Sequence, residues 1–512
     1  MGSDKTNEDL SKHVKQDLKL SVLSGPLTVI IPVLSYIFLY PIILSRSSIE
    51  VLGLWSLYVT TASFFTVADI GFSQHFVREA SKDQSPNILR ILKEELLSAR
   101  RFYLLLGLVG VIILLVFNKV IFVSSEKIYP PSGLLISAII LIISGTIQLI
   151  SSLDAAILSA RADNYYVRLI RSISSIFTYS IAVCGALLDL PIEGFSVGFF
   201  ISNNFLILVY HRRFKIKHKD WHSVNISAPF KQSLKDLKNL LQKSLQLYSV
   251  SIGMLIRQPV VRYVVAISLG LSATGVFDIA MRVTTTLREI AANGFSTLFP
   301  FFSYFYRRND KRKIINVIRT SLIILIPVGF ISTIIFIFYS EFIYSIWLKE
   351  IPPGAVLATI VLAIWQLITL INVPFWHLLL ASHNEKIAAI SIWAHTLSIL
   401  LIIPLKLIGI EFALYSLLIY WTATSLLTQL LIYISVERKL SLLWIVFKSK
   451  QIISIIIINV IYFILTMFTG RLIETEIGIP HPEKLALTVL FLITLAPFYI
   501  KLLKQNVPLK KI

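Results

Sequence analysis

The chain has 512 residues, of which 56% are hydrophobic, and its mean hydropathy is +0.78. Apolar runs of about 20 residues recur from one end to the other, and each is long enough to cross a hydrocarbon core of about 30 Å. This composition excludes a soluble globular protein and predicts an all-α polytopic membrane protein.

The net charge of +20 could indicate a nucleic-acid partner, but the distribution of the charges argues against one. If the first span runs outward from a cytoplasmic N-terminus, most of the 48 lysines and arginines fall on the inside. The predicted outside segments hold only Arg46, Lys119, Lys127, Lys349, Lys406, Arg471 and Lys484. This asymmetry follows the positive-inside rule and predicts that both termini are cytoplasmic. The basic residues then serve topology and contact with anionic membrane lipids.

About fourteen membrane-spanning helices are predicted along the chain. A polar cytoplasmic tail precedes them, and a basic segment, 78–101, follows the second span with leucines at helical spacing, as in a helix that lies on the membrane surface. The predicted spans cover residues 21–44, 50–76, 102–122, 133–159, 166–188, 192–210, 244–268, 272–302, 316–340, 355–380, 387–406, 411–435, 451–469 and 484–503.

The spans are predicted to form two six-helix lobes and a trailing pair. The segments are a tail at 1–20, an N-lobe at 21–210, a basic cytoplasmic linker at 211–243, a C-lobe at 244–435, and the last two helices with a cytoplasmic tail at 436–512. An internal repeat supports the two lobes: Gly53-Leu-Trp55 matches Gly275-Val-Phe277, and Gly71-Phe72-Ser73 matches Gly294-Phe295-Ser296. Two further matches, Gly133 with Gly354 and Leu158-Ser159-Ala160 with Leu379-Leu380-Ala381, have nearly the same offset of about 222 residues. The offset covers six helices, so the lobes are predicted to be parallel, with a site between them.

Residues 254–294, within the seventh and eighth predicted spans, contain four arginines and two acids. A charged side chain near the middle of a membrane helix costs about 2.5–3.5 kcal/mol, so these arginines need counter-charges or a polar lumen. Arg257 and Arg262 lie about 140° apart around their helix, whereas Gln258 shares a face with Arg262. The planar guanidinium suits phosphate, so Arg257 and Arg262, with Gln258, are candidate contacts for a phosphate-bearing substrate.

On the eighth span, Asp278, Arg282 and Glu289 share a face. Asp278 and Arg282 are interpreted mainly as an ion pair, and both remain candidates, Arg282 for substrate and Asp278 for ion coupling. Glu289 either neutralises Arg257 or Arg262 or acts as a proton-coupling group, because burial can raise a carboxyl pKa toward neutrality. Arg288 is predicted to contact substrate, since the arginines outnumber the acids.

Further candidates lie outside this stretch. Asp69 either caps a helix or pairs with Arg78, and it is also a possible ion-coupling group. Arg78, Arg168 and Arg171 are predicted at the cytoplasmic mouth, where they either attract a phosphate headgroup or simply anchor the helix ends. His395 and His377 are possible proton sites, although an interhelical hydrogen bond is the more common role for such histidines.

The second span carries a family resemblance. The run Gly53-Leu-Trp55-Ser-Leu, Phe64-Phe65 and Ala68-Asp69-Ile70-Gly71-Phe72-Ser73, followed by Arg78, resembles the Wzx-type O-antigen and polysaccharide flippases of the multidrug/oligosaccharidyl-lipid/polysaccharide exporter superfamily. Elsewhere the similarity is one of architecture: about fourteen spans in two lobes and a trailing pair.

The resemblance implies a transporter of the bacterial cytoplasmic membrane that moves an undecaprenyl-pyrophosphate-linked oligosaccharide to the outer leaflet by alternating access. It implies coupling to H⁺ or Na⁺, a role in cell-surface polysaccharide (O-antigen, lipopolysaccharide or capsule) biosynthesis, and possible work with a polysaccharide polymerase and a chain-length regulator. Related lipid flippases carry cationic residues on spans 1, 2 and 8. Arg282 and Arg288 match this on span 8, whereas span 1 has no charged residue before Arg46.

Two alternatives stay open. A multidrug exporter of the same superfamily would be expected to have an acidic lumen for organic cations, and here the candidate lumen is basic. A membrane polysaccharide polymerase or ligase would need larger outer loops than the sequence predicts. The chain has no GxxxxGK[ST] motif for ATP and no ligand spacing for zinc, so neither an enzyme nor a metal or organic cofactor is predicted.

Overall fold

The computed structural model describes residues 27–69, 71–80, 86–122, 128–160, 163–217, 250, 252–295, 298–348, 350–382, 384–440, 449 and 452–461. Every regular element in these ranges is an α-helix, which confirms the predicted fold class for this part of the chain. The predicted tail at 1–20, most of the linker at 211–243, the second half of the thirteenth span and all of the fourteenth lie outside the described residues.

Nine of the described helices are long and apolar enough to span a membrane, or ten if the bent pair α14 and α15 forms one span. The chain is therefore a polytopic membrane protein over the part that the structure describes. The described helices form two compact units, Met1–Tyr263 and Val264–Ile512, each of which is considered by itself below.

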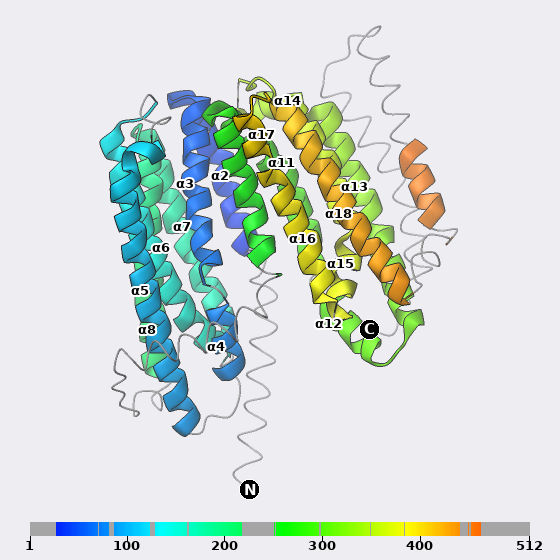
Figure 1. Cartoon of the computed structure of the whole chain (residues 1–512), viewed down its shortest axis with the longest axis horizontal. Coiled ribbons are helices and arrows are strands. Elements are labelled where there is room, and N and C mark those ends of the chain that lie inside the picture. The colour runs from blue at the N-terminus through cyan, green and yellow to red at the C-terminus, as the bar shows by residue number, and fades with distance from the viewer. Residues whose placement is uncertain are drawn as a thin grey trace. The chain divides into compact units, whose positions relative to one another are not determined.

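In the first unit, α6 is the central helix. It packs against α3, α4, α5 and α8, while α7 packs against α2 and α8 (Figure 1). Gly185 of α7 and Gly194 of α8 make the closest of these approaches possible, because a Cβ on Gly185 would lie 2.5 Å from the Cα of Gly194. The helices of this unit are α2 (Leu27–Arg46), α3 (Ile49–Val67), α4 (Phe72–Ala80), α5 (Pro86–Phe122), α6 (Pro131–Ala160), α7 (Asn164–Leu187) and α8 (Pro191–Lys217), with the first part of the helix Ile252–Leu269.

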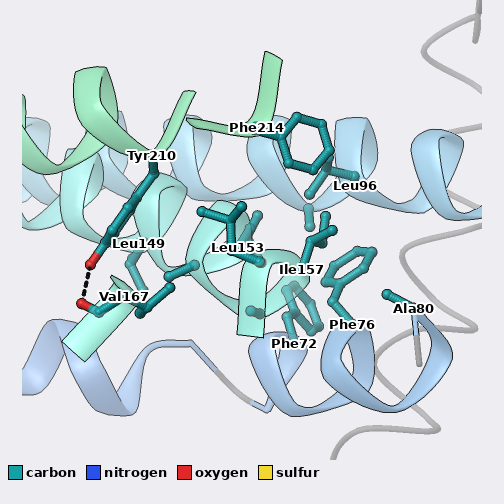
Figure 2. Close-up of a cluster of buried hydrophobic side chains, with 14 of the residues drawn as sticks. Phe72, Phe76, Ala80, Leu96, Leu149, Leu153, Ile157, Val167, Tyr210 and Phe214 are labelled. Carbon is teal, nitrogen blue, oxygen red and sulfur yellow. Dashed lines mark hydrogen bonds between the residues drawn. The ribbon is translucent and has the colours of Figure 1, made fainter. Parts of the chain in front are cut away.

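Aromatic and aliphatic side chains form a dense core at one end of this unit, where the charge pattern predicts the cytoplasm. Phe72 and Phe76 of α4 pack with Leu153 and Ile157 of α6, as Figure 2 shows. The same figure shows the Tyr210 hydroxyl, which donates a 3.0 Å hydrogen bond to the Val167 carbonyl and so joins α8 to α7. Burying apolar side chains stabilises this end by about 1.5–3 kcal/mol for each large one.

In the second unit, α14 is the central helix, packed against α11, α13 and α18. Trp365 of α14 stacks on Trp421 of α18 with 4.5 Å between ring centroids, and the Trp365 Nε1 donates a 3.1 Å hydrogen bond to the Ser425 Oγ. The helices of this unit are α11 (Leu271–Gly294), α12 (Leu298–Arg307), α13 (Lys311–Leu348), α14 (Ala355–Ile371), α15 (Val373–Ala381), α16 (Glu385–Leu400), α17 (Ile402–Leu407) and α18 (Leu414–Leu440).

The order and length of the helices repeat along the described part of the chain. The long helix α5 has 37 residues and α13 has 38, and both α8 and α18 have 27. The packing partners repeat as well: α6 contacts α3, α5 and α8, while α14 contacts α11, α13 and α18. The two copies are therefore built on one plan within their own units.

The second predicted span, 50–76, was wrong as a single helix. α3 ends at Val67 and α4 begins at Phe72, because Gly71 takes a left-handed backbone conformation with φ +80° that only glycine adopts freely. Asp69 stabilises the break by accepting the Ser73 backbone N–H at 3.2 Å. The eighth predicted span, 272–302, is also not one helix: α11 ends at Gly294 and α12 begins at Leu298.

Two other expectations also change. The basic segment 78–101 is no separate surface helix: from Pro86 it is the start of α5, which continues unbroken to Phe122 and buries Leu92 and Leu96 in the core. The tenth predicted span, 355–380, is bent by 41° between α14 and α15. Pro374, at the start of α15, has no backbone N–H to continue the hydrogen-bond ladder of α14, which explains the bend.

Candidate functional site

The helix Ile252–Leu269 carries three of the predicted substrate contacts. Arg262 is buried, with 7% of its surface exposed, while Arg257 and Gln258 are half-buried. Tyr263, on the next position, shares a 2.5 Å hydrogen bond with the Thr61 hydroxyl of α3. Both arginines already have interaction partners, so their contact with a substrate stays a prediction.

The charged helix of the second unit is α11. It has 24 residues, enough to cross a bilayer, yet it is too polar to count among the apolar candidate spans of the described chain. Asp278 is fully buried, and its Oδ2 lies 3.8 Å from the Arg282 Nε, which is the ion pair that the spacing indicated. α11 packs this polar sequence against α14 and α13.

Arg288 of α11 has different surroundings from Arg282. Its guanidinium carbon lies 6.0 Å from the centre of the Trp365 ring, within the range of a cation–π contact. The Arg288 Nε is buried and has no hydrogen-bond partner among the residues that the structure describes. The acid that acts on it electrostatically is Glu289, its half-buried neighbour in the chain. Arg288 thus contacts the Trp365 ring, and its Nε–H donates no hydrogen bond within the described chain.

The structure places His395 in a hydrogen bond between two helices. His395 is buried, its Nε2 donates a 3.2 Å hydrogen bond to the Trp421 carbonyl, and its ring stacks parallel to Trp421 at 5.9 Å. This bond joins α16 to α18, the interhelical role that such histidines usually have. His377 is half-buried on α15.

Asp69 caps α4, which is the first of the two roles that the sequence allowed. Its carboxylate accepts hydrogen bonds from the Ser73 backbone N–H, the Ser73 Oγ at 3.1 Å and the Tyr103 hydroxyl at 2.6 Å. Three donors, two of them on α4 and one on α5, fix the carboxylate at the break between α3 and α4. Its place there explains why the Ala-Asp-Ile-Gly-Phe-Ser run ends one helix and begins another.

The three arginines predicted at the cytoplasmic mouth come together in the structure. Arg78 of α4 and Arg168 and Arg171 of α7 line one cavity of about 430 Å³ within the first unit. The other polar groups in its lining are Ser73, Gln74, Ser152, Ser159 and Asn164. We refer to this space as the arginine cavity.

This cavity and its polar lining were not predicted from the sequence, although the small residues of α6 could have indicated them. Ser152, Ala155, Ala156 and Ser159 recur at helical spacing on α6, so one face of that helix carries only small side chains opposite α4 and α7. A second, mostly apolar cavity of about 300 Å³ lies between α3, α5 and α6, with the hydroxyl residues Tyr58, Thr61 and Tyr263 in its lining.

The described helices form a polytopic all-α membrane fold with charged side chains inside each unit. No protein-family model matches the chain, and no curated protein matches it. Among solved structures, the lipid II flippase MurJ in an inward closed conformation aligns with a TM-score of 0.66 and 16% identity, over 94% of this chain and 99% of that one.

Two transporters of the MOP superfamily align over 84% of this chain and 96% of theirs. One is a multidrug resistance MATE family transporter in an inward-facing conformation, with a TM-score of 0.59 and 13% identity. The other is a transporter from Pyrococcus furiosus, with a TM-score of 0.53 and 14% identity, which is described as having a binding pocket of reversed polarity. The chain therefore has a MOP-like fold, and its structural neighbours are transporters and flippases, not enzymes.

Proposed function

We propose that the protein is a flippase that moves an undecaprenyl-pyrophosphate-linked oligosaccharide from the cytoplasmic to the outer leaflet of a bacterial membrane by alternating access. The comparison with the lipid II flippase supports a lipid-linked cargo, and the arginines of α11 and of the helix Ile252–Leu269 support an anionic headgroup. We also propose that the oligosaccharide is an O-antigen or capsule repeat unit, as the motif in the second predicted span suggests.

One observation carries it: only one copy of the repeat bears the charges. With Gly53 matched to Gly275, Asp278 and Arg282 correspond to Ser56 and Thr60. In the first copy the Thr60 Oγ1 donates a 2.7 Å hydrogen bond to the Ser56 backbone carbonyl. The two corresponding positions of α3 are therefore occupied by uncharged residues. The fold therefore does not require arginines there.

The same comparison holds for Arg288, which corresponds to Thr66 of α3. Since each charge inside a membrane helix costs about 2.5–3.5 kcal/mol, a fold that can do without it gains nothing from keeping it. An anionic headgroup that crosses the membrane supplies the reason, because a guanidinium binds phosphate oxygens through two parallel hydrogen bonds. Arg288, with a buried Nε that lacks a partner in the described chain, is the strongest candidate for that contact.

Ion coupling is assigned by elimination among the candidates. Asp278 is paired with Arg282, Asp69 is fixed by Ser73 and Tyr103, and His395 bonds to a carbonyl. Glu289, half-buried beside Arg288, is the group that we propose for H⁺ coupling.

The test uses the protein in liposomes with a fluorescent polyprenyl-pyrophosphate oligosaccharide, whose arrival in the outer leaflet is read by a membrane-impermeant quencher. Arg288→Ala should lower apparent affinity about tenfold to a hundredfold, since a hydrogen bond to a charged group contributes about 1.5–3 kcal/mol. Arg288→Lys should recover part of it. The matched control is Arg307→Ala, which removes an exposed arginine at the end of α12.

Full transport by Arg288→Ala would remove the proposed substrate contact. The multidrug alternative is tested in the same liposomes with an organic cation in place of the lipid. Export of the cation without movement of the lipid would replace the flippase with a drug exporter.

A further inference from the structure

The arginine cavity lies within the first unit and shares no residue with α11 or the helix Ile252–Leu269. We propose that it is a separate binding site for a diphosphate group. The site itself does not depend on the proposed function; its use as a loading site for the headgroup of a transported lipid does.

The lining of the cavity is cationic, and none of its residues is acidic. Arg168 and Arg171 are three positions apart on α7 and so project from the same side of that helix, while Arg78 comes from α4. The amides of Gln74 and Asn164 add neutral polar atoms to this lining. The hydroxyls of Ser73, Ser152 and Ser159 already donate hydrogen bonds within the protein. Such a set of groups recognises anions that have several oxygens.

Three acids on or next to the helices around the cavity have partners outside its lining or at its edge. Asp69 accepts from Ser73 and Tyr103, and Asp154 of α6 forms an ion pair with Arg100 of α5. Asp163, directly before α7, accepts two hydrogen bonds from Arg213 of α8, at 3.2 and 3.3 Å. Glu79 follows Arg78 on α4 but does not line the cavity. None of these carboxylates lies in the lining of the cavity.

The first turn of α7 adds to the positive potential. Asp163 occupies the N-cap position, but its side chain makes no capping hydrogen bond to α7. The N-terminus of a helix carries a partial positive charge and free backbone N–H donors, which favour an anion. Asn164, Val167 and Arg168 of this turn and the next all line the cavity.

The size of the cavity indicates the class of anion. About 430 Å³ lies within the usual range of small-molecule sites, roughly 300–1,000 Å³, and is far more than a halide ion needs. Three guanidinium groups match the charge of a diphosphate better than that of a monophosphate, since each guanidinium can bind two oxygens.

The frame behind the lining is tightly packed. Phe72 and Phe76 of α4 and Ile157 of α6 belong to the buried core at this end of the unit (Figure 2). The hydrogen bond from Tyr210 to Val167 fixes the first turns of α7 to α8. Backbone positions that carry the arginines are therefore set before any ligand arrives, which lowers the entropy cost of binding.

A diphosphate group could reach the cavity on a lipid headgroup or as a free ion. Binding is measured by calorimetry on the purified full-length protein in detergent, with inorganic diphosphate, with farnesyl diphosphate, and with sulfate as a control for charge alone. Affinity for inorganic diphosphate equal to that for farnesyl diphosphate indicates recognition of the free group. Affinity for farnesyl diphosphate alone indicates a lipid headgroup.

Two kinds of variant test the location. The double variant Arg168→Gln with Arg171→Gln should weaken diphosphate binding by at least a hundredfold, whereas Arg212→Gln, an exposed arginine at the end of α8, should not. Ser159→Leu keeps all three arginines and narrows the cavity, so it should also weaken diphosphate binding. The variant Arg288→Ala should still bind diphosphate. This result would separate the arginine cavity from the proposed transport site.

Failure of both diphosphates to bind the unmodified protein would overturn the proposal. So would equal binding by the double glutamine variant and Arg212→Gln, or sulfate binding as tight as that of diphosphate. Transport that fails in Arg288→Ala while diphosphate binding continues would leave this site intact.

Discussion

The pair between Asp278 and Arg282 offers a test of whether charge at this position is structural. Asp278 is fully buried and Arg282 is one-quarter exposed, with 3.8 Å between the Oδ2 and the Nε. Asp278→Ser leaves a mostly buried guanidinium without its carboxylate. Breaking a buried pair costs about 3–5 kcal/mol, and the exposure of Arg282 places the expected loss near the lower limit.

The first copy of the repeat indicates which second substitution should restore the stability lost in Asp278→Ser. Ser56 and Thr60 occupy the corresponding positions of α3 without charge, and the Thr60 Oγ1 donates a hydrogen bond to the Ser56 backbone carbonyl. The double variant Asp278→Ser with Arg282→Thr should therefore recover most of the stability lost in Asp278→Ser, because no unpaired charge remains. The coupling between the two positions should be at least about 1 kcal/mol in a double-mutant cycle.

The measurement is thermal unfolding in detergent, followed by intrinsic tryptophan fluorescence. A loss of about 3 kcal/mol lowers Tm by about 6–12 °C for a unit of roughly 250 residues. The arginine variant Arg282→Thr alone completes the cycle. A double variant no more stable than Asp278→Ser, or an Asp278→Ser variant with unchanged Tm, would refute the reasoning.

Two further predictions concern the first unit. Gly185→Leu should destabilise it by about 1–3 kcal/mol, since the new Cβ meets the backbone of Gly194 and forces α7 away from α8; a normal Tm by differential scanning fluorimetry would contradict the close approach. Tyr103→Phe removes the 2.6 Å hydrogen bond to Asp69 and should cost about 1–3 kcal/mol in the same assay. Tyr415→Phe, at an exposed position, is its control and should leave Tm unchanged.

Much of the fold could be predicted from the sequence, because membrane spans and repeats have strong periodic signals. The predicted boundaries of α6 and α7 are within a few residues of those in the structure. The breaks after α3 and α11 were missed, since hydropathy is averaged over a window and is insensitive to one glycine. The Asp-x-Gly-x-Ser run did contain the information, because Asp69 caps and Gly71 turns.

The sites were less predictable for a different reason. Spacing along one helix indicated the Asp278 and Arg282 pair, which is a local interaction. The contact between Arg288 and Trp365 joins residues far apart in the chain, and periodicity carries no signal for it. Arg257 has an interaction partner, so the sequence overstated its isolation.

The bend between α14 and α15 has a mechanical consequence. Its counterpart α6 is one unbroken helix of 30 residues, so the two copies of the repeat differ in stiffness along the same element. An unbroken helix transmits a displacement from one end to the other like a rod. Two segments joined at Asn372 can change their angle through a few backbone dihedrals. The two copies therefore share one plan but differ in stiffness along this element, and any conformational change would bend the second copy more easily than the first.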